Sequence, residues 1–456
     1  MDYLIVSMTS NFSELVEKAA SLIMHAKQST RFRIISHYDA DGITAATIIC
    51  KALYRKNFDF HVSLMRNPFT KGLEKVQKEH NDFLIFTDLG SGQLEMIEKI
   101  LVQSIIIDHH QLKKERVPDH VLQINANQCG INGNYEACGA TLSYAVAKAI
   151  DEKNKDLIAY ALAGAIGDKQ YIGGFKGYNK SLVEEAVDEH LIEKKIGLKL
   201  SEKTIADSIY YSVEPFFKGL SGHKENVTSF LQSIEVDEKK SYDLLCDDEK
   251  ERLHSALMLK LLKQGCESNI LETVIRERYY HKYTYGEMEQ FADLLDSCGK
   301  GGNRDLGLSL TLGDQNSYEK AKKVERSYKE NILEELLRLE NEGAEEVSSY
   351  RYFYTDYTSL GGVVGGIAAN FIFDIQKPLL SIARKDHELH ISCRGNQHLV
   401  EKGLDLGKAM SVVAEQLDGH GGGHKIAAGA TVPSSSEKIF LQEVDNIISQ
   451  QLNRKK

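Results

Sequence analysis

Apolar residues in the first third of the chain fall into two kinds of run that alternate along the sequence. Residues 31–36, 83–87 and 104–108 form short runs that are rich in β-branched and aromatic side chains and bounded by polar residues, a pattern that predicts buried strands. Residues 43–56 and 93–101, which lie between those runs, have the composition and length of helices. Strands that alternate with helices predict an α/β domain with a parallel sheet and helices on both faces.

Acidic and imidazole side chains stand where these predicted strands end. Parallel strands end at one edge of a sheet, and such sheets bind their ligands beyond that edge. A fourth segment, the helical one predicted over 156–168, also ends at an acidic residue. One Asp after a strand is commonly a helix cap or a turn residue. Here that explanation would have to hold separately for each of the four segments. It also does not explain the two adjacent histidines. The candidate residues are His37, Asp39, Asp41, Asp88, Asp108, His109, His110 and Asp168.

The chemistry of such a cluster points to metal ions. Crowded carboxylates repel one another and take up protons unless cations neutralise them. Carboxylate oxygens combined with imidazoles suit Mn²⁺, and Mg²⁺ is a harder competitor that prefers oxygen. Two divalent ions about 3.5 to 4 Å apart clamp the attacking and leaving oxygens of a phosphoryl transfer. These residues therefore favour a two-metal site that hydrolyses a phosphate ester or anhydride.

The last quarter of the chain changes to short strands and glycine, beginning with residues 361–373. Residues 379–384 and 388–394 read as two strands joined by a short polar link. This arrangement predicts a β-hairpin, with Asp386 and His387 in its turn.

Residues 419–424, with the sequence GHGGGH, are too rich in glycine for a regular element and predict a loop. Because glycine has no side chain, the backbone N–H groups of such a loop can approach an anion closely. The run lacks the spacing of a P-loop, and a glycine-rich linker is the alternative interpretation.

The middle of the chain, from about 190 to 345, carries charges at helical spacing. Such runs are typical of the solvated faces of packed or bridging helices. Lys300 and Arg304 stand among glycines, and they fit either a path for a nucleic-acid strand or a simple turn.

Composition limits these predictions. With 456 residues, 42% hydrophobic and 27% charged, the chain is ordinary globular protein and too long for one core. No apolar run approaches the roughly 18 residues of a membrane span and no signal-peptide pattern is present, so we expect a cytoplasmic protein without membrane contact. Seven cysteines without a C-x-x-C pair indicate reduced thiols. The net charge of −10 opposes nucleic-acid binding overall, but a groove needs only local positive charge.

Four motifs, SHYDADG, TDLG, IIIDHHQ and GAIGD, occur in this order and closely resemble those of the DHH phosphoesterases. The D-A-D-G form resembles the RecJ-like branch of that superfamily. The resemblance implies two divalent metal ions, Mn²⁺ or Mg²⁺, with Asp88 bridging them. One ion would be held by Asp39 and Asp88, and the other by Asp41, Asp88, His109 and Asp168.

The resemblance also implies roles for the remaining residues of these motifs. His110 would face the scissile phosphate, and Asp108 would orient a neighbouring histidine. In some members a first-motif histidine stands four residues before the first Asp, where this chain has Ile35. His37 stands two residues before Asp39 instead, so a role as a metal ligand and a role beside the ligands or the substrate both stay open.

The sequence SCRG followed by GHGGGHKIAAG resembles the DHHA1 domain that accompanies the DHH domain. The resemblance implies that Arg394 and His424 grip substrate phosphates in a cleft between the two domains, where the planar fork of arginine suits a pair of phosphate oxygens. The substrate-binding loop would include His420, Gly421, Gly422 and Gly423. The predicted domains are a DHH catalytic domain at 1–190, a mostly helical middle segment at 191–345 and a DHHA1 domain at 346–456.

By resemblance, the leading hypothesis is a metal-dependent RecJ-like exonuclease that hydrolyses single-stranded DNA or RNA to mononucleotides in replication or repair. Archaeal relatives of this kind associate with the GINS complex, which implies a replication-fork partner. An oligonucleotide or cyclic-dinucleotide phosphodiesterase is an alternative, because those enzymes use the same pair of domains. A scaffold without catalysis, like the eukaryotic relative in the replicative helicase, is an alternative of another class. The presence of every implied metal ligand favours an active enzyme.

Overall fold

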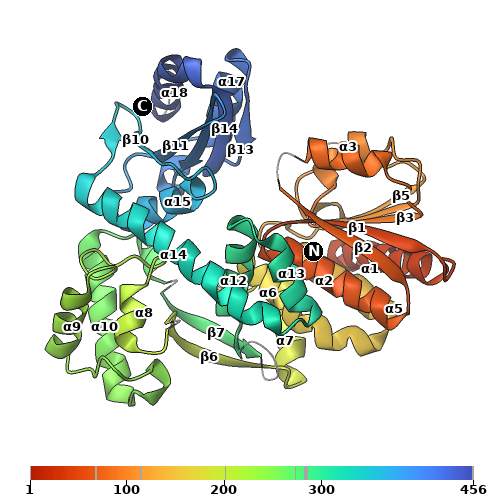
Figure 1. Ribbon diagram of the computed structural model, residues 1–456, viewed down its shortest axis with the longest axis horizontal. Helices are drawn as coiled ribbons and strands as arrows, with labels where there is room; N and C mark the ends of the chain where they lie inside the picture. The colour runs from red at the N-terminus through yellow and green to blue at the C-terminus, as the bar shows by residue number, and fades with distance from the viewer. Residues whose placement is uncertain are drawn as a thin grey trace. The chain divides into compact units, whose positions relative to one another are not determined.

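The computed structural model describes residues 2–66, 69–112, 116–200, 202–272, 274–281 and 286–453. The chain forms two compact units, each assembled from two stretches of sequence (Figure 1). The first unit takes residues 1–197 and 277–326, and the second takes residues 198–276 and 327–456. The middle segment is therefore divided between the units, and the three-domain division stays a prediction.

The first unit is built on a five-stranded parallel sheet. Its strands, in spatial order, are β2 (Asp59–Met65), β1 (Arg31–His37), β3 (Phe83–Thr87), β4 (Ser104–Asp108) and β5 (Val121–Asn125). The three strands predicted from sequence are confirmed, and β2 and β5 extend the sheet on either side. Every residue of β3 and β4 is buried, as expected for parallel strands that are covered on both faces.

Helices cover both faces of this sheet, as predicted. One face carries α1 (Asp2–Met24), α2 (Ala40–Arg55), α5 (Gly139–Ile150) and α6 (Ile158–Gly167), and the other carries α3 (Thr70–Lys78) and α4 (Leu94–Ile97). Alternate side chains of β3 serve the two cores: Ile85 packs with α2 and α5, and Phe86 packs with α3 and α4. The helix predicted over 93–101 is shorter than expected, because the chain turns after Ile97 to enter β4.

The remaining elements of the first unit come from both of its stretches of sequence. They are α7 (Gly177–Asp188), the small sheet of β6 (Ile192–Leu198), β7 (Ile275–His281) and β8 (Gly286–Glu287), and the helices α12 (Met288–Lys300) and α13 (Arg304–Leu312). Helix α12 packs against α6, and α13 packs against α2. A buried hydrogen bond of 2.6 Å between the hydroxyls of Thr47 and Thr311 ties α2 to α13.

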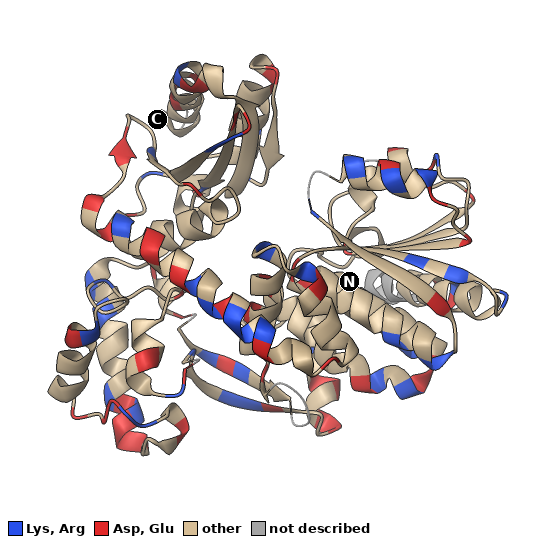
Figure 2. Ribbon diagram, in the orientation of Figure 1, with Lys and Arg blue, Asp and Glu red and all other residues tan. Residues whose placement is uncertain are grey.

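The second unit combines helices with a six-stranded sheet. Its helices are α8 (Ile205–Tyr210), α9 (Lys224–Ser233), α10 (Asp247–Gln264), α11 (Ser268–Leu271), most of α14 (Asn316–Glu342), α15 (Gly361–Phe371), α16 (Gln397–Glu401), α17 (Leu406–Gln416) and α18 (Glu437–Asn453). Charges of both signs alternate along α14 (Figure 2). No helix in the described part of the chain combines the length and the apolar character of a membrane span.

The sheet of the second unit is mixed. Its spatial order is β13 (His420–Gly423), β14 (Ala427–Pro433), β12 (Glu388–Arg394), β11 (Leu379–Lys385), β10 (Arg351–Tyr354) and β9 (Glu345–Glu346). Helices α17 and α18 pack on one face, and α15 packs on β11 and β12 from the other. The predicted hairpin is confirmed as β11 and β12, and its turn residues Asp386 and His387 have left-handed φ values of 50° and 65°.

Two expectations for this unit are wrong. Residues 361–371 form helix α15 rather than a strand, because the buried residues Val364, Ile367, Ala368 and Phe371 repeat at helical spacing. Residues 420–423 form strand β13 rather than a loop. Glycine is required there by close backbone approach: a Cβ on Gly421 would lie 2.4 Å from the carbonyl oxygen of Met410.

Candidate metal centre

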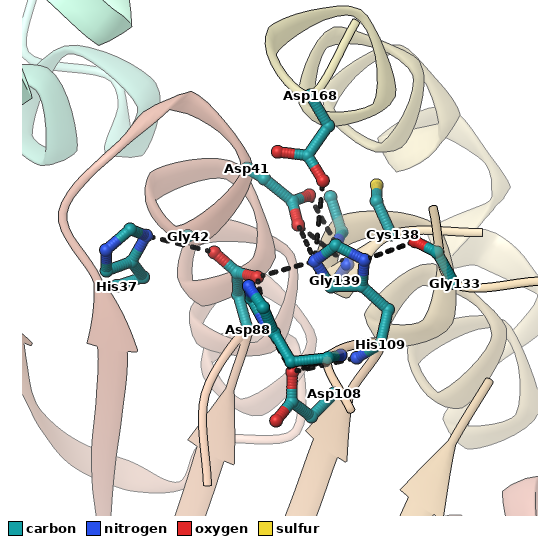
Figure 3. A network of polar contacts seen from close by, with 12 residues as sticks. His37, Asp41, Gly42, Asp88, Asp108, His109, Gly133, Cys138, Gly139 and Asp168 are labelled. Carbon is teal, nitrogen blue, oxygen red and sulfur yellow. Dashed lines mark hydrogen bonds and ion pairs between the residues drawn. The ribbon is translucent and has the colours of Figure 1, made fainter. Parts of the chain in front are cut away.

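The ends of β1, β3 and β4 and the end of α6 bring the predicted acidic and imidazole residues to one place in the first unit (Figure 3). Three sets of possible ligands form among the described residues, and the ligand atoms within each set lie within 4.8 Å of one another. The first set is His37, Asp39 and Asp88, and the second is Asp41, His109 and Asp168. A third set, Asp88, Asp108, His109 and His110, shares Asp88 with the first and His109 with the second.

Asp88 belongs to the first set and also contacts the second. Its backbone φ of 56° falls in the left-handed region, which is strained for a residue with a side chain and is found at functional sites. One of its carboxylate oxygens lies 3.1 Å from Nε2 of His109, and the other lies 3.5 Å from Nδ1 of His37. Asp88 therefore presents one oxygen to each set.

His109 is oriented by a backbone carbonyl. Its Nδ1 lies 2.6 Å from the carbonyl oxygen of Gly133, which can only accept, so Nδ1 carries the hydrogen. Nε2 then faces three carboxylates, with oxygen distances of 3.8 Å to Asp41, 3.1 Å to Asp88 and 3.4 Å to Asp168. A carbonyl that fixes the tautomer in this way is a common partner of a metal-binding imidazole.

Asp41 is buried and held by the start of helix α5. Its two oxygens accept hydrogen bonds from the backbone N–H groups of Gly139 at 2.7 Å and Ala140 at 2.8 Å, which have no partner inside their own helix. The surroundings leave no room for side chains: a Cβ on Gly139 would lie 2.5 Å from Cβ of Asp88, and one on Gly164 would lie 2.6 Å from Oδ1 of Asp41. These glycines let the segments meet.

Asp39 is the N-cap of α2. One oxygen accepts a hydrogen bond of 3.1 Å from the N–H of Gly42, and the other lies 2.7 Å from Nδ1 of His37. A Cβ on Gly42 would lie 2.3 Å from the carbonyl oxygen of His37, so glycine allows this loop to fold back on itself. The loop thus places His37 in the cluster, and its role there stays a prediction.

Asp108 shapes the loop that carries the two histidines. Its Oδ1 accepts from the backbone N–H groups of His109 at 2.8 Å and His110 at 3.1 Å and lies 2.8 Å from Nδ1 of His110, while Oδ2 accepts from the N–H of Ser91 at 2.9 Å. These donors occupy both oxygens of Asp108. The His110 side chain is 54% exposed, so its remaining ring nitrogen can be reached from solvent.

The electrostatics of the cluster favour a cation. Burial raises the pKa of Asp41 well above its usual value, and the neighbouring carboxylates of Asp88 and Asp168 raise it further. Burial also raises the pKa of Asp168 to about 7. Burial opposes protonation of His109, but the surrounding carboxylates outweigh it and raise its pKa. Divalent cations would replace the protons that these groups hold, so the donor set fits metal ions.

The sequence did not predict the contribution of α12 to this site. Oδ1 of Asp296 accepts a hydrogen bond of 2.8 Å from the N–H of Ala40, and Lys300 pairs with Asp296 one turn later. Burial favours the protonated form of Asp39, but His37 and then the charge of Lys300 outweigh it and lower its pKa. Helix α12 therefore supplies a positive charge beside the first set of ligands.

A signal for this contact is present in the sequence CGKGG at residues 298–302. A Cβ on Gly299 would lie 1.9 Å from the carbonyl oxygen of Tyr38, so the helix can reach the loop only where it has no side chain. The two residues are far apart in the chain, and the glycine alone does not identify its neighbour.

The second unit holds a half-buried arginine, Arg394, that forms no ion pair with a carboxylate of the described residues. Nη1 of Arg394 donates to the carbonyl oxygen of Cys393 at 2.8 Å, and burial lowers the pKa of the guanidinium. The guanidinium lies against the start of α15, where a Cβ on Gly362 would be 2.7 Å from Nη2. A helix start and a cation together make a site of positive potential that suits an anion.

The register of the sheet decides which of the other predicted residues accompany this arginine. Arg394 pairs with Ala427 of β14, and the N–H of His424 donates to the carbonyl oxygen of Ala427 at 2.8 Å. The exposed His424 therefore lies at the same end of the sheet as Arg394. His420 pairs with Thr431 and lies at the opposite end of β13.

Comparison with known proteins finds a family match at each end of the chain. The DHH family, N-terminal domain, matches residues 31–167, and the DHHA1 domain matches residues 350–450. The chain is 30% identical over 429 residues to an uncharacterized protein of Methanocaldococcus jannaschii, covering 92% of this chain and 94% of that protein. It is 23% identical over 271 residues to the single-stranded-DNA-specific exonuclease RecJ of Thermus thermophilus, covering 55% of this chain and 40% of RecJ.

Two solved structures share the fold. RecJ of Thermus thermophilus in complex with Mn²⁺ has a TM-score of 0.60 and 17% identity, covering 96% of this chain and 55% of that chain. CDC45 of Entamoeba histolytica has a TM-score of 0.65 and 12% identity, covering 98% of this chain and 99% of that chain. The chain thus spans about half the length of RecJ and nearly all of CDC45.

Proposed function

The chain belongs to the DHH family and carries a DHHA1 domain, and on this basis we propose that it is a metal-dependent exonuclease that hydrolyses single-stranded DNA or RNA to mononucleotides. The observation that carries the proposal is the position of Asp88, with one oxygen toward each of two ligand sets. A carboxylate shared in this way is typical of two-metal phosphoryl-transfer sites. RecJ, a single-stranded-DNA-specific exonuclease solved with Mn²⁺, supports the substrate class and the metal.

The donor set determines where the ions would bind. One ion would be held by Asp39 and Asp88 with His37 beside them, and the other by Asp41, Asp88, His109 and Asp168. Mn²⁺ suits this mixture of carboxylate and imidazole, and Mg²⁺ is the competitor. When bound, the ions supply an acidified water for attack on phosphorus and stabilise the charge that develops on its oxygens.

Residues of the chain prepare the site for this chemistry. The carbonyl of Gly133 and the start of α5 hold His109 and Asp41 before a substrate arrives, which reduces the reorganisation that the reaction needs. Burial opposes protonation of His110, but its hydrogen bond to Asp108 outweighs burial and raises the pKa of the ring. We assign His110 the contact with the scissile phosphate, where the protonated ring donates a hydrogen bond to a phosphate oxygen.

The second unit supplies phosphate-binding residues in this proposal. Arg394 and His424 bind phosphate groups of the strand, because the half-buried guanidinium has no carboxylate partner among the described residues and the start of α15 favours an anion. A role of this kind affects how tightly the substrate binds more than how fast the bound substrate reacts.

The direct test is an assay of the whole chain with Mn²⁺ or Mg²⁺ on end-labelled single strands of DNA and RNA. We expect metal-dependent release of mononucleotides. Asp88→Asn should slow it about a thousandfold, since loss of the shared ligand removes several kcal/mol of transition-state stabilisation. The exposed acid Asp119 provides the matched control, and Asp119→Asn should retain activity. Cleavage of cyclic dinucleotides alone would move the assignment to that alternative, and full activity in Asp88→Asn would remove the two-metal mechanism.

The likeness to CDC45 over nearly the whole of both chains favours a second candidate, a scaffold of the replication fork without catalysis. This candidate predicts no hydrolysis by the wild-type chain at any Mn²⁺ concentration, together with stable binding of a partner such as the GINS complex. The retained ligands in both sets favour the enzyme instead. Activity and partner binding measured on the same preparation separate the two.

A further inference from the structure

A buried glutamine lies just beyond the end of helix α6. The side chain of Gln170 is 3% exposed, and each of its polar atoms has a partner. Nε2 donates to the carbonyl oxygens of Gly133 and Ala137, both at 3.0 Å, and Oε1 accepts from Nδ2 of Asn179 at 2.6 Å. The amide therefore joins its own turn to residues 133–137 and to Asn179.

Through Gly133, the segment 133–137 holds a histidine of the metal centre. The carbonyl oxygen of Gly133 that accepts from Gln170 also accepts from Nδ1 of His109, at 2.6 Å. One carbonyl with two donors is fixed in direction by both of them. Gln170 thus helps to set the orientation of the His109 ring.

The same segment, through Ala137, is also connected to an aspartate of the same ligand set. Ala137, whose carbonyl accepts from Gln170, is two residues before Gly139. The N–H of Gly139 donates to Oδ2 of Asp41 at 2.7 Å. If this segment shifted, the N–H of Gly139 would shift with it, and the carboxylate of Asp41 would lose its position.

The third ligand, Asp168, is joined to Gln170 through the backbone. Helix α6 ends in a Schellman motif: the N–H of Lys169 donates to the carbonyl of Ile166 at 2.9 Å, and that of Gln170 donates to the carbonyl of Ala165 at 3.0 Å. Lys169 takes the left-handed conformation of this motif, with a φ of 57°. Asp168 and Gln170 are therefore held in one rigid turn.

We propose that Gln170 is a positioning residue that fixes the spacing of Asp41, His109 and Asp168, and thereby sets the affinity of this ligand set for a divalent cation. The inference rests on the metal centre of the proposed function and adds a residue that lies outside the ligand sets. Outer residues that orient metal ligands typically change metal affinity about 10- to 100-fold when they are removed. The effect should fall on the second ligand set, because no hydrogen bond of Gln170 reaches the first.

The test is titration of the whole chain with Mn²⁺ by calorimetry, without nucleic acid. Gln170→Met keeps the volume of the side chain and removes its hydrogen bonds. We expect one of the two Mn²⁺ binding events to weaken about 10- to 100-fold, with the other nearly unchanged. Asn154→Leu is the matched control, since Asn154 is also a fully buried amide with a donor bond to a backbone carbonyl, that of Ala147 at 2.7 Å.

A second variant keeps the test informative if Gln170→Met does not fold. Asn179→Ala removes the donor that orients Gln170 and leaves its bonds to Gly133 and Ala137 in place, so the same binding event should weaken by a smaller factor. Equal weakening of both events, an unchanged isotherm in Gln170→Met, or the same loss in Asn154→Leu would overturn the proposal. The two proposals can fail separately. If Gln170→Met weakens one Mn²⁺ binding event as predicted but the wild-type chain degrades no nucleic acid, the nuclease assignment is wrong and this inference stands.

Discussion

The two candidate sites of this chain present opposite electrostatic problems. In the first unit, Asp41, Asp88 and Asp168 crowd together, and burial raises the pKa of Asp41 and Asp168. In the second unit, the half-buried guanidinium of Arg394 forms no ion pair with a carboxylate of the described residues, and its partial burial lowers its pKa. A partly desolvated charge without an opposite charge costs stability, and proteins retain such charges where function requires them. The first site therefore suits cations, and the second suits an anion.

Among changes that affect only the first site, we expect Gly139→Ala to reduce Mn²⁺ affinity most. The new Cβ would lie 2.5 Å from Cβ of Asp88, so the carboxylates must move apart. We expect Mn²⁺ affinity to fall about 100-fold and unfolding free energy to fall by about 1 to 3 kcal/mol from overpacking. Gly92→Ala is the control, because a Cβ there meets nothing within 4 Å. Calorimetry and denaturant unfolding measure both, and a stabilised Gly139→Ala with intact Mn²⁺ binding would contradict this geometry.

Arg394→Met separates the second site from the first. Loss of a charge-assisted hydrogen bond of about 1.5 to 3 kcal/mol should weaken binding of a single strand roughly 10- to 100-fold. The same change removes a half-buried charge without a carboxylate partner among the described residues, so the free energy of unfolding should rise, by at most about 1 kcal/mol. Mn²⁺ titration should be unchanged. Lower stability together with unchanged strand affinity would mean that the arginine is structural.

The pH dependence of metal binding provides a smaller and directional effect. The pKa of Asp168 is raised to about 7 and that of His109 is also raised, so the metal-free folded chain holds protons that the unfolded chain releases. These bound protons stabilise the metal-free folded chain fully at a pH below the pKa values that the two groups have in the unfolded chain. The stabilisation is lost as pH rises through the pKa values that they have in the folded chain. The increase in Tm caused by Mn²⁺ should therefore be larger at pH 8 than at pH 6. In Asp168→Asn, the Mn²⁺-induced increase in Tm should differ little between pH 6 and pH 8. A wild-type chain in which this increase in Tm becomes smaller at higher pH would contradict the assignment of Asp168 and His109 as metal ligands.

Lys300→Met is expected to give the smallest effect. Removing this charge leaves Asp296 unpaired beside Asp39, so Mn²⁺ should bind a few-fold more tightly while a single strand binds a few-fold more weakly. Both changes should fade at high salt. Weaker binding of Mn²⁺ in this variant would show that Lys300 acts through the fold rather than through its charge.

Sequence patterns predicted those strands whose environment is uniformly apolar. The strands β3 and β4 are buried along their whole length, so their runs are continuous. Strand β5 was missed because it buries Gln123 and Asn125, which both donate to Oγ of Ser91, at 3.0 and 2.8 Å. Only the folded structure reveals that these polar side chains have partners. Helix α15 was missed because its glycines serve close packing and hide the helical period.

Motif spacing predicted the possible metal ligands better than it predicted the groups that orient them. Asp39, Asp88 and His109 stand in short motifs at the ends of predicted strands, so their convergence follows from parallel topology. The carbonyl of Gly133 and the Asp296 contact lie in segments without a chemical signature, and the latter is 256 positions from its partner. Long-range contacts of this kind depend on packing that a sequence pattern does not specify.

The central claim is that Asp88 holds two divalent ions at once. Anomalous diffraction from crystals soaked in Mn²⁺ tests it directly. We predict two peaks about 3.5 to 4 Å apart, with one carboxylate oxygen of Asp88 on each and with Asp39 and His109 on opposite sides. A single peak, or two peaks with both oxygens of Asp88 on the same ion, would contradict the account.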